Sequence, residues 1–481
     1  MYVSQKIRRA IVLSVMTGSL TLLPSFCPIN VNVSMPVSVV SMAHAEVRTY
    51  TGIGKYIMSE YETQEIAQQR AINKAMRDAK DKAGVHLQTY SRSVSGNLTN
   101  DEIFAITNNI TDVLEKKCVP VPFEANGEAG LMYEATVTVT IDPNGISEWL
   151  KRDAQDRFNI VNQNNAERQA DEENDRKVED LRKRLRNATT DEERARIRAE
   201  YEQADNEFRV NQFLKEGNQL YYQGDYNGAI AKYNEALNLN PNFDWAYNNR
   251  GLAYGNLQNY DAAMADYNKA IELNPNDAEA YNNRGNTYVS LKQYDQALAD
   301  YTRAIELNPD SVESYNNRGF VYLCLKKHNE AIADCTKAIE LNPNLDKAYY
   351  RRGLSYRSLD KYDEAISDFN KAIELKPNDS DYFMNRGSCY LMSQNADKAL
   401  ADFNKTIALE PNKTEVFLHR GIAYAVLSKY KEAIADLTKY INSNPNDANG
   451  YSFRAMCYEA TGDTIRAQVD KDKAKQLGNN A

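Results

Sequence analysis

Seven prolines recur at a fixed interval of 34 residues in the C-terminal half of this chain, and no other feature constrains its fold as strongly. A glycine also recurs every 34 residues, and an alanine takes its place in the last copy. An alanine later in each copy recurs at the same interval. A fixed period of about 20–50 residues indicates stacked copies of one supersecondary unit. The prolines are Pro241, Pro275, Pro309, Pro343, Pro377, Pro411 and Pro445.

Each copy has the pattern of two helices. Helical spacing puts one set of residues on a face of a first helix and another set on a face of a second helix: Tyr281, Gly285 and Tyr288, then Ala297, Tyr301 and Ala304. Gly285 and Ala297 are small, so the two helices can cross closely. Pro309 ends the second helix because proline lacks the N–H group that helix continuation needs. A helix pair leaves apolar surface exposed unless another pair stacks on it.

The unit AYNNRGNTYVSLKQYDQALADYTRAIELNP resembles the tetratricopeptide repeat family, and the resemblance covers residues 211–481. It implies a mainly α fold, a right-handed superhelical solenoid of about eight helix pairs. It also implies a concave groove, lined by the first helices, that binds peptide segments or partner domains. Lys471 stands where other copies carry a large apolar residue, which suits a C-terminal capping helix with one face in water.

An arginine precedes the glycine of most copies, and an aspartate follows sixteen positions after that arginine, as in Arg284 and Asp300. In the first copy both signs reverse, with Glu216 and Lys232. Pairing with the next copy would place Lys232 against Arg250, so we predict an ion pair between the two helices of each copy. We expect these arginines to be structural and exclude them as ligands.

Two sets of groove residues are candidates for binding a partner polypeptide. Asparagine pairs recur in three successive copies, and such amides can grip an extended backbone or be ordinary surface residues: Asn248 and Asn249, Asn282 and Asn283, Asn316 and Asn317. One subgroup of the family grips acidic C-terminal tails with a two-carboxylate clamp. Alignment by the glycines places four residues on the last four of its five positions: Asn286, Asn317, Lys347 and Arg351. Asn282 holds the first position, normally Lys. We expect a partner with an acidic segment or a C-terminal carboxylate; a solvated face is the alternative.

Residues 1–45 have the pattern of an export signal. Three cations precede the apolar stretch 11–23, no acidic residue occurs before Glu46, and Ala43 and Ala45 supply small residues for signal cleavage. We expect a bacterial protein exported to the periplasm or cell surface, without a membrane span after cleavage. An uncleaved N-terminal anchor remains the alternative.

Residues 46–150 do not repeat and predict a small α+β domain. We expect a strand at 50–58, a helix at 63–83 closed by Gly84, a strand at 85–94, a short helix near 101–107, and a hairpin of strands 118–123 and 132–141. The segment AQQRAINKAMRDAKDKAG resembles N-terminal domains of bacterial envelope and flagellar assembly proteins. His86 and Cys118 are the conceivable base and nucleophile, but no nucleophile motif or orienting acid accompanies them.

Half of residues 151–210 are charged, and the segment contains no Gly or Pro, which predicts a solvated helical spacer. A short helical hairpin or a coiled coil is one form that such a spacer can take. Thr190 and Glu193 form a capping-box pattern. Acids interleave with its cations and the chain has a net charge of −9, which argues against nucleic acid as a partner. Only four histidines occur, and we expect no metal and no cofactor.

Taken together, the sequence predicts an exported, non-enzymatic scaffold for a partner polypeptide, with a role in cell-envelope assembly. Two alternatives remain open. One is an enzyme or carbohydrate-processing component with its chemistry in residues 46–150, and the other is a structural protein that associates with itself.

Overall fold

A computed structural model of the chain describes residues 48–58, 63–94, 103, 106–107, 111–125, 128–141 and 154–478. These residues form two compact units, of which one ends at Asn308 and the other begins at Pro309. The predicted export signal lies outside the described residues. None of the helices in the described part of the chain is long and apolar enough to cross a membrane.

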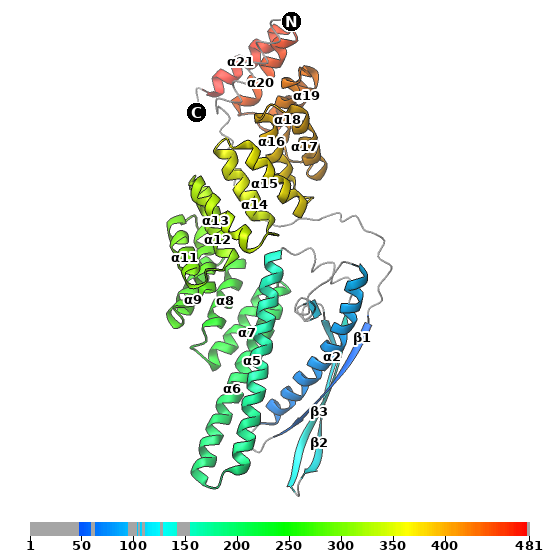
Figure 1. Cartoon of the computed structure of the whole chain (residues 1–481), viewed down its shortest axis with the longest axis vertical. Helices are drawn as coiled ribbons and strands as arrows, with labels where there is room; N and C mark the ends of the chain where they lie inside the picture. The colour runs from blue at the N-terminus through cyan, green and yellow to red at the C-terminus, as the bar shows by residue number, and fades with distance from the viewer. Residues whose placement is uncertain are drawn as a thin grey trace. The chain divides into compact units, whose positions relative to one another are not determined.

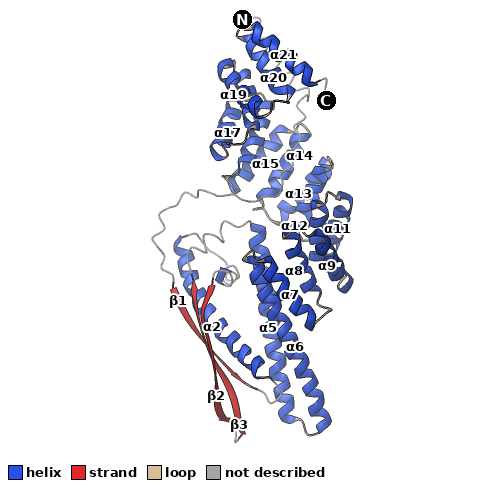
Figure 2. Cartoon of the chain, turned by 180° about the vertical axis from the view of Figure 1, so that it is seen from behind, coloured by secondary structure: helices blue, strands red, loops and turns tan. Residues whose placement is uncertain are grey.

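The first unit opens with a three-stranded antiparallel sheet covered on one face by a helix (Figure 1). Its elements are β1 (Arg48–Ile57), α2 (Gln64–Val94), β2 (Thr111–Ala125) and β3 (Glu128–Ile141), and the strand order is β1-β3-β2. The predicted hairpin is confirmed as β2 and β3. Figure 2 shows the strands confined to this part of the described chain. This is the predicted small α+β domain.

Two glycines of β1 allow α2 to lie directly on the sheet. A Cβ atom at Gly52 would stand 2.0 Å from the carbonyl oxygen of Ala75, and one at Gly54 would stand 2.2 Å from that of Ala71. Alanines of α2 recur every four residues on the facing side and are fully buried. Small residues on both elements therefore set the separation between helix and sheet.

Our prediction for residues 84–94 was wrong. Gly84 does not end the helix and no strand follows it, because α2 continues without interruption to Val94. A Cβ atom at Gly84 would meet only Thr107 and Ile103, at 3.6 and 3.7 Å. The glycine therefore marks a packing contact with Ile103 and Thr107. Glycine in a helix interior costs only about 1 kcal/mol relative to alanine, which such contacts can offset.

The charged segment folds into a helical hairpin of α5 (Ala154–Asn187) and α6 (Asp191–Tyr222). A thin apolar core joins the two helices, including Val178, Leu181, Ile197 and Tyr201. Thr190 caps α6 by accepting a hydrogen bond from the Glu193 amide at 3.2 Å, as predicted, while the Glu193 carboxylate accepts from the Thr189 amide. α6 runs on past residue 210, so the expected boundary between spacer and repeats falls inside one continuous helix.

The hairpin packs against the α+β domain, which differs from the solvated spacer that we expected. Arg70 of α2 is buried and donates to Asn174 Oδ1 at 3.0 Å and to Asp205 Oδ1 at 3.1 Å. Its guanidinium also lies 4.5 Å from the centroid of the Phe208 ring. The many charges of residues 151–210 predicted a segment exposed to water. Asp205 of that segment is buried instead, because Arg70 of α2 neutralises it in the interface.

Helix pairs follow in both units. The end of α6 pairs with α7 (Tyr226–Leu239), and two further pairs complete the first unit: α8 (Asp244–Asn256), α9 (Tyr260–Leu273), α10 (Ala278–Ser290) and α11 (Tyr294–Leu307). Five pairs form the second unit: α12 (Val312–Cys324), α13 (His328–Leu341), α14 (Asp346–Ser358), α15 (Tyr362–Leu375), α16 (Ser380–Met392), α17 (Ala396–Leu409), α18 (Glu415–Val426), α19 (Tyr430–Ser443), α20 (Ala448–Ala460) and α21 (Thr464–Gly478). The eight predicted helix pairs are thus all present.

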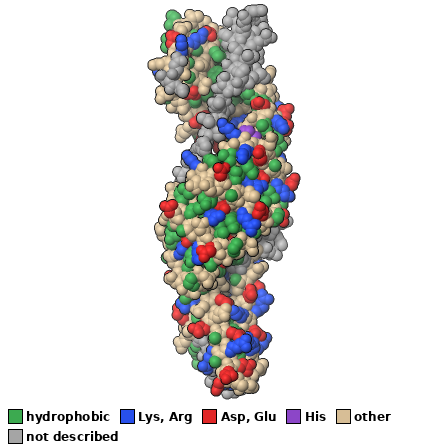
Figure 3. Space-filling model, turned by 90° about the vertical axis from the view of Figure 1, so that its left-hand side faces the viewer, with side chains coloured by type: hydrophobic (Ala, Val, Ile, Leu, Met, Phe, Trp, Pro, Cys, Tyr) green, Lys and Arg blue, Asp and Glu red, His purple; other side chains and the backbone are tan. Residues whose placement is uncertain are grey.

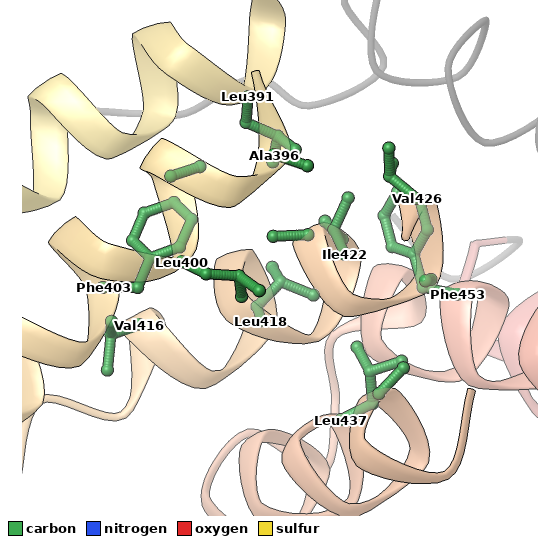
Figure 4. Packing of buried hydrophobic residues seen from close by; sticks show 14 of the residues in the cluster. Leu391, Ala396, Leu400, Phe403, Val416, Leu418, Ile422, Val426, Leu437 and Phe453 are labelled. Carbon is green, nitrogen blue, oxygen red and sulfur yellow. The ribbon is translucent and has the colours of Figure 1, made fainter. Parts of the chain in front are cut away.

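The repeated glycine marks the point where the two helices of a pair cross. At Gly285 a Cβ atom would stand 2.7 Å from the Tyr301 ring, and at Gly387 it would stand 2.8 Å from the Phe403 ring. In the second unit the rings and aliphatic side chains of α16 to α20 form one cluster, which Figure 4 shows around Phe403, Leu418 and Ile422. Each pair thus buries its apolar face against its neighbours, as the repeat argument requires.

Candidate functional site

The repeated arginines form the predicted ion pairs. Arg284 donates from Nε to Asp300 Oδ2 at 2.8 Å and from Nη2 to Asp300 Oδ1 at 2.7 Å. This bidentate hydrogen bond raises the pKa of Arg284. The reversed pair of the first copy is present as well, with Lys232 Nζ 2.9 Å from Glu216 Oε2. The predicted ion pair is thus confirmed both in the Arg–Asp copies and in the reversed Glu216–Lys232 copy. These arginines have a structural role in the repeats.

Six of these arginines also tie one repeat to the preceding one within the same unit, a contact that was not predicted from the sequence. Arg284 Nη1 donates to Asn268 Oδ1 at 2.7 Å, on the second helix of the repeat before it. The other such acceptors described within one unit are Asn234, Thr336, Asn370, Asn404 and Thr438. The sequence does indicate this contact, because a short polar residue recurs every 34 residues at the position of Asn268. One side chain therefore fixes three helices.

Three asparagine candidates of the first unit form hydrogen bonds to asparagines of the adjacent repeat. Asn283 Nδ2 donates to Asn248 Oδ1 at 3.1 Å, and Asn249 Nδ2 donates to Asn218 Oδ1 at 3.0 Å, in each case between first helices of adjacent repeats. Asn248, Asn282 and Asn283 are buried. Amides in these positions thus help to space the repeats, and their role in binding a partner stays a prediction.

Asn286 is the exposed member of this set. Its Oδ1 accepts a hydrogen bond from the Tyr301 hydroxyl at 2.6 Å, so the ring that packs under Gly285 also orients the amide. An amide held in this way presents its NH₂ group in a fixed direction. Asn286 is therefore the best placed of the predicted asparagines in this unit to contact a ligand.

The cationic candidates lie on α14 in the second unit. Arg351 Nη1 donates to the backbone oxygen of Asn316 at 2.7 Å, and its guanidinium lies 4.7 Å from the centroid of the Phe320 ring. Lys347 is exposed one turn earlier on the same helix, and Asn317 is half-buried on α12. Asn316, Asn317, Lys347 and Arg351 thus all lie in the second unit, while the other predicted site residues belong to the first.

Repeats of the second unit carry different chemistry at the positions of these asparagines, a change that was not predicted from the sequence. The positions equivalent to Asn248, Asn282 and Asn316 carry Tyr350, Met384 and Leu418 in the following repeats. The position of Asn286 carries Ile422 two repeats after Leu354. Met384, Leu418 and Ile422 are buried in the cluster of Figure 4. A comparison at the 34-residue interval would have found this change from amides to apolar side chains.

The conceivable catalytic residues of the front domain gain no support from the geometry. Cys118 is half-buried, its thiol faces the Gln68 carbonyl at 3.9 Å, and burial raises the pKa of the thiol. A nucleophilic cysteine requires the opposite shift. His86 lies on α2, and its side chain is outside the described part of the structure.

The buried cysteines of the repeats are also unsuited to nucleophilic chemistry. Burial raises the pKa values of Cys335, Cys389 and Cys457 to about 12.

Two further observations bear on ligand classes. Within the described residues, no group of three His, Cys, Asp or Glu side chains is arranged to hold a metal ion. On the face that Figure 3 shows, Lys and Arg side chains are interspersed with Asp and Glu.

Comparison with known proteins agrees with the helix pairs. The family model described as tetratricopeptide repeat matches residues 245–277, 278–311, 312–345 and 346–379, and a second model, described as TPR repeat, matches residues 217–258. A search of curated proteins gave no match for this chain.

Solved structures of similar proteins cover the repeats. YrrB, titled a TPR protein with an unusual peptide-binding site, is 28% identical over 38% of this chain and 95% of its own, with a TM-score of 0.35. MamA is 27% identical over 36% of this chain and 94% of its own, with a TM-score of 0.33. A tetratricopeptide repeat protein from Parabacteroides merdae is 21% identical over 52% of this chain and 98% of its own, with a TM-score of 0.39. With the helix pairs and the 34-residue interval, the family-model matches identify residues 217–379 of this chain as tetratricopeptide repeats.

Proposed function

We propose that this protein is an exported, non-enzymatic scaffold that holds a partner polypeptide on the first-helix face of its repeats. One observation carries the proposal: the frame of the repeats is uniform while their exposed face varies. Bidentate Arg–Asp pairs recur at the same two positions in seven repeats. One exposed position, by contrast, carries Glu279, Lys347 and Glu415 in different repeats. A rigid frame with a varied face suits selective binding of an extended ligand.

Lys347 and Arg351 are the residues that we assign to an acidic group of the partner. Neighbouring repeats carry acids at the Lys347 position, so the cation is a local feature of an acidic chain. A guanidinium has five N–H donors, so the hydrogen bond from Arg351 to the Asn316 carbonyl is compatible with carboxylate binding. The contact also holds the guanidinium in place, which lowers the entropy cost of binding. Asn317, in the same unit, would hold the backbone of the ligand.

The test uses a synthetic peptide that is acidic and ends in a free carboxylate, with its amidated form for comparison. We expect Lys347→Glu and Arg351→Glu to weaken binding at least about tenfold each, since a charge-assisted hydrogen bond is lost and a repulsion is added. The matched control is Lys337→Glu on the second helix α13, a lysine whose side chain is 43% exposed. Equal binding by all variants, or equal loss in the control, would exclude the assigned site.

Export and a role in cell-envelope assembly belong to the same proposal and rest on the N-terminal pattern described above. We expect the mature protein to be recovered from the bacterial envelope fraction with Glu46 as its first residue, which N-terminal sequencing of the purified protein would establish. Cross-linked capture from intact cells should then yield an envelope protein that the Arg351→Glu variant does not retain. A full-length chain recovered from the cytosol would contradict export without touching the peptide site.

A further inference from the structure

Helix α14 carries a further cation that the proposed peptide site does not use. Arg357 lies in the last turn of α14, six residues after Arg351, and its side chain is half-buried. At the 34-residue interval the adjacent repeats carry Leu323 and Leu391. A cation therefore stands in this repeat where its two neighbours have an apolar side chain.

Arg357 contacts the next repeat through an amide and not through an acid. Its Nη1 donates a hydrogen bond to Oδ1 of Asn385 on α16. Asn385 Nδ2 donates in turn to the Tyr350 hydroxyl at 3.0 Å and to the Asp381 backbone oxygen at 2.8 Å. The amide is therefore fixed with its oxygen toward Arg357, and the guanidinium is held between the first helices of two adjacent repeats.

Within the described residues, no carboxylate forms an ion pair with Arg357. The arginines at the ion-pair position of seven repeats, by contrast, each have an aspartate. Asp360 follows three residues after Arg357 but accepts a hydrogen bond from the Tyr362 hydroxyl. The acid of α16 that lies nearest in the sequence to Asn385, Asp381, pairs with Lys413 at 2.5 Å. The nearby acids thus have other partners.

The charge of Arg357 acts on groups that are removed from water. His419 of α18 is 5% exposed, and burial together with the charge of Arg357 lowers its pKa to about 4. Burial raises the pKa of the Cys389 thiol to about 12, and Arg357 opposes this rise. Both groups are therefore neutral near pH 7 and supply no negative charge. A partly buried cation without a counter-charge costs free energy, which an added anion would recover.

We propose that Arg357 binds a second acidic group of the partner polypeptide, an inference that rests on the function proposed above. Lys347 and Arg351 would hold one carboxylate and Arg357 the other. Six residues separate the two arginines, which is about 9 Å along α14. An extended peptide covers this distance in about three residues. The hydrogen bond to Asn385 uses one of the five N–H donors of Arg357, so donors remain for a carboxylate.

Fluorescence anisotropy with two labelled synthetic peptides tests the proposal. Both peptides end in a free carboxylate, and they differ only three residues before the end, where one has Glu and the other Gln. We expect the wild-type protein to bind the Glu peptide about tenfold more tightly, and Arg357→Met to abolish this preference. The matched control is Lys361→Met, which removes an equal charge from an exposed lysine four residues further on and should keep the preference.

The ratio of the two affinities separates ligand binding from a structural role of Arg357 in the last turn of α14. A variant that binds both peptides more weakly but keeps the preference would overturn the proposal, as would a wild-type protein without a preference. Arg357→Lys should keep part of the preference, because the charge remains without the planar fork of donors. Binding of the Gln peptide that depends on Arg351, with no gain for the Glu peptide, would refute the second position alone. Absence of binding for both peptides would refute the proposed function as well.

Discussion

Replacement of Gly285 by alanine tests whether the repeat glycine exists to let the two helices cross. The new Cβ atom would stand 2.7 Å from Tyr301 Cε1 and 3.0 Å from Cδ1, whereas carbon atoms in good contact are about 3.5–4.0 Å apart. The ring cannot withdraw easily, because Tyr301 is 1% exposed and its hydroxyl is hydrogen-bonded to Asn286. The helices must therefore separate or the ring must leave its rotamer.

The expected size follows from two opposing terms. Overpacking of a core costs about 1–3 kcal/mol, and removing a glycine from a helix gains about 1 kcal/mol. We expect Gly285→Ala to lower the free energy of unfolding by up to about 2 kcal/mol. Gly255→Ala on α8 is the matched control, because the nearest atom of another element is the Tyr267 hydroxyl oxygen at 4.0 Å. This variant should gain up to about 1 kcal/mol.

Urea unfolding followed by circular dichroism measures both variants, and hydrogen exchange of α10 and α11 shows whether the loss is local. Repeat arrays depart from two-state unfolding, so the comparison uses transition midpoints at unchanged slope. Equal stabilisation by both substitutions would refute the reasoning, since it would mean that the helices have room at Gly285.

Three further predictions concern other parts of the chain. Lys292 adopts a left-handed conformation with φ of 58°, where Gly224 and Gly462 stand in other repeats, so Lys292→Gly should raise the free energy of unfolding by about 1 kcal/mol; an unchanged urea midpoint would contradict this. Burial lowers the pKa of His419 to about 4, so the unfolded chain takes up a proton near pH 6.5 that the folded chain does not. Stability should therefore fall by about 2 kcal/mol as the pH drops from 7 to about 5, and thermal unfolding of His419→Gln should lack this component. Arg70→Met leaves Asp205 buried without its cation and should cost about 3–5 kcal/mol, seen as faster hydrogen exchange in α5 and α6; unchanged exchange there would show that the contact does not hold the hairpin.

The repeats could be predicted well from the sequence, because each inference from one copy can be compared with the equivalent residues of the other copies. Arg284 and Asp300 alone would have been an ambiguous pair, but the reversed pair of Glu216 and Lys232 excluded pairing with the next repeat. The hairpin of β2 and β3 was predictable for a similar reason, since alternation along two short segments is a local pattern.

Predictions failed where a residue had more than one physical use. Gly84 was taken as the end of a helix, but it lies inside α2 and faces Thr107. Asn248 and Asn283 were predicted as groove ligands or ordinary surface residues; the hydrogen bond between them across adjacent repeats was not expected, and their role in binding stays a prediction. A glycine tolerates many environments and an amide binds many partners, so neither residue type reports which one it has.

The order of the helix pairs, their crossing points and their ion pairs follow from the sequence alone. Each of these features depends on contacts within one 34-residue repeat or between adjacent repeats. The packing of the hairpin on the α+β domain was decided only in three dimensions. Arg70 meets Asp205 across 135 positions of the chain, and nothing local marks either residue as buried. The open face of the sheet is likewise a tertiary result: the side that α2 covers decides which alternate residues of β1 remain exposed to water.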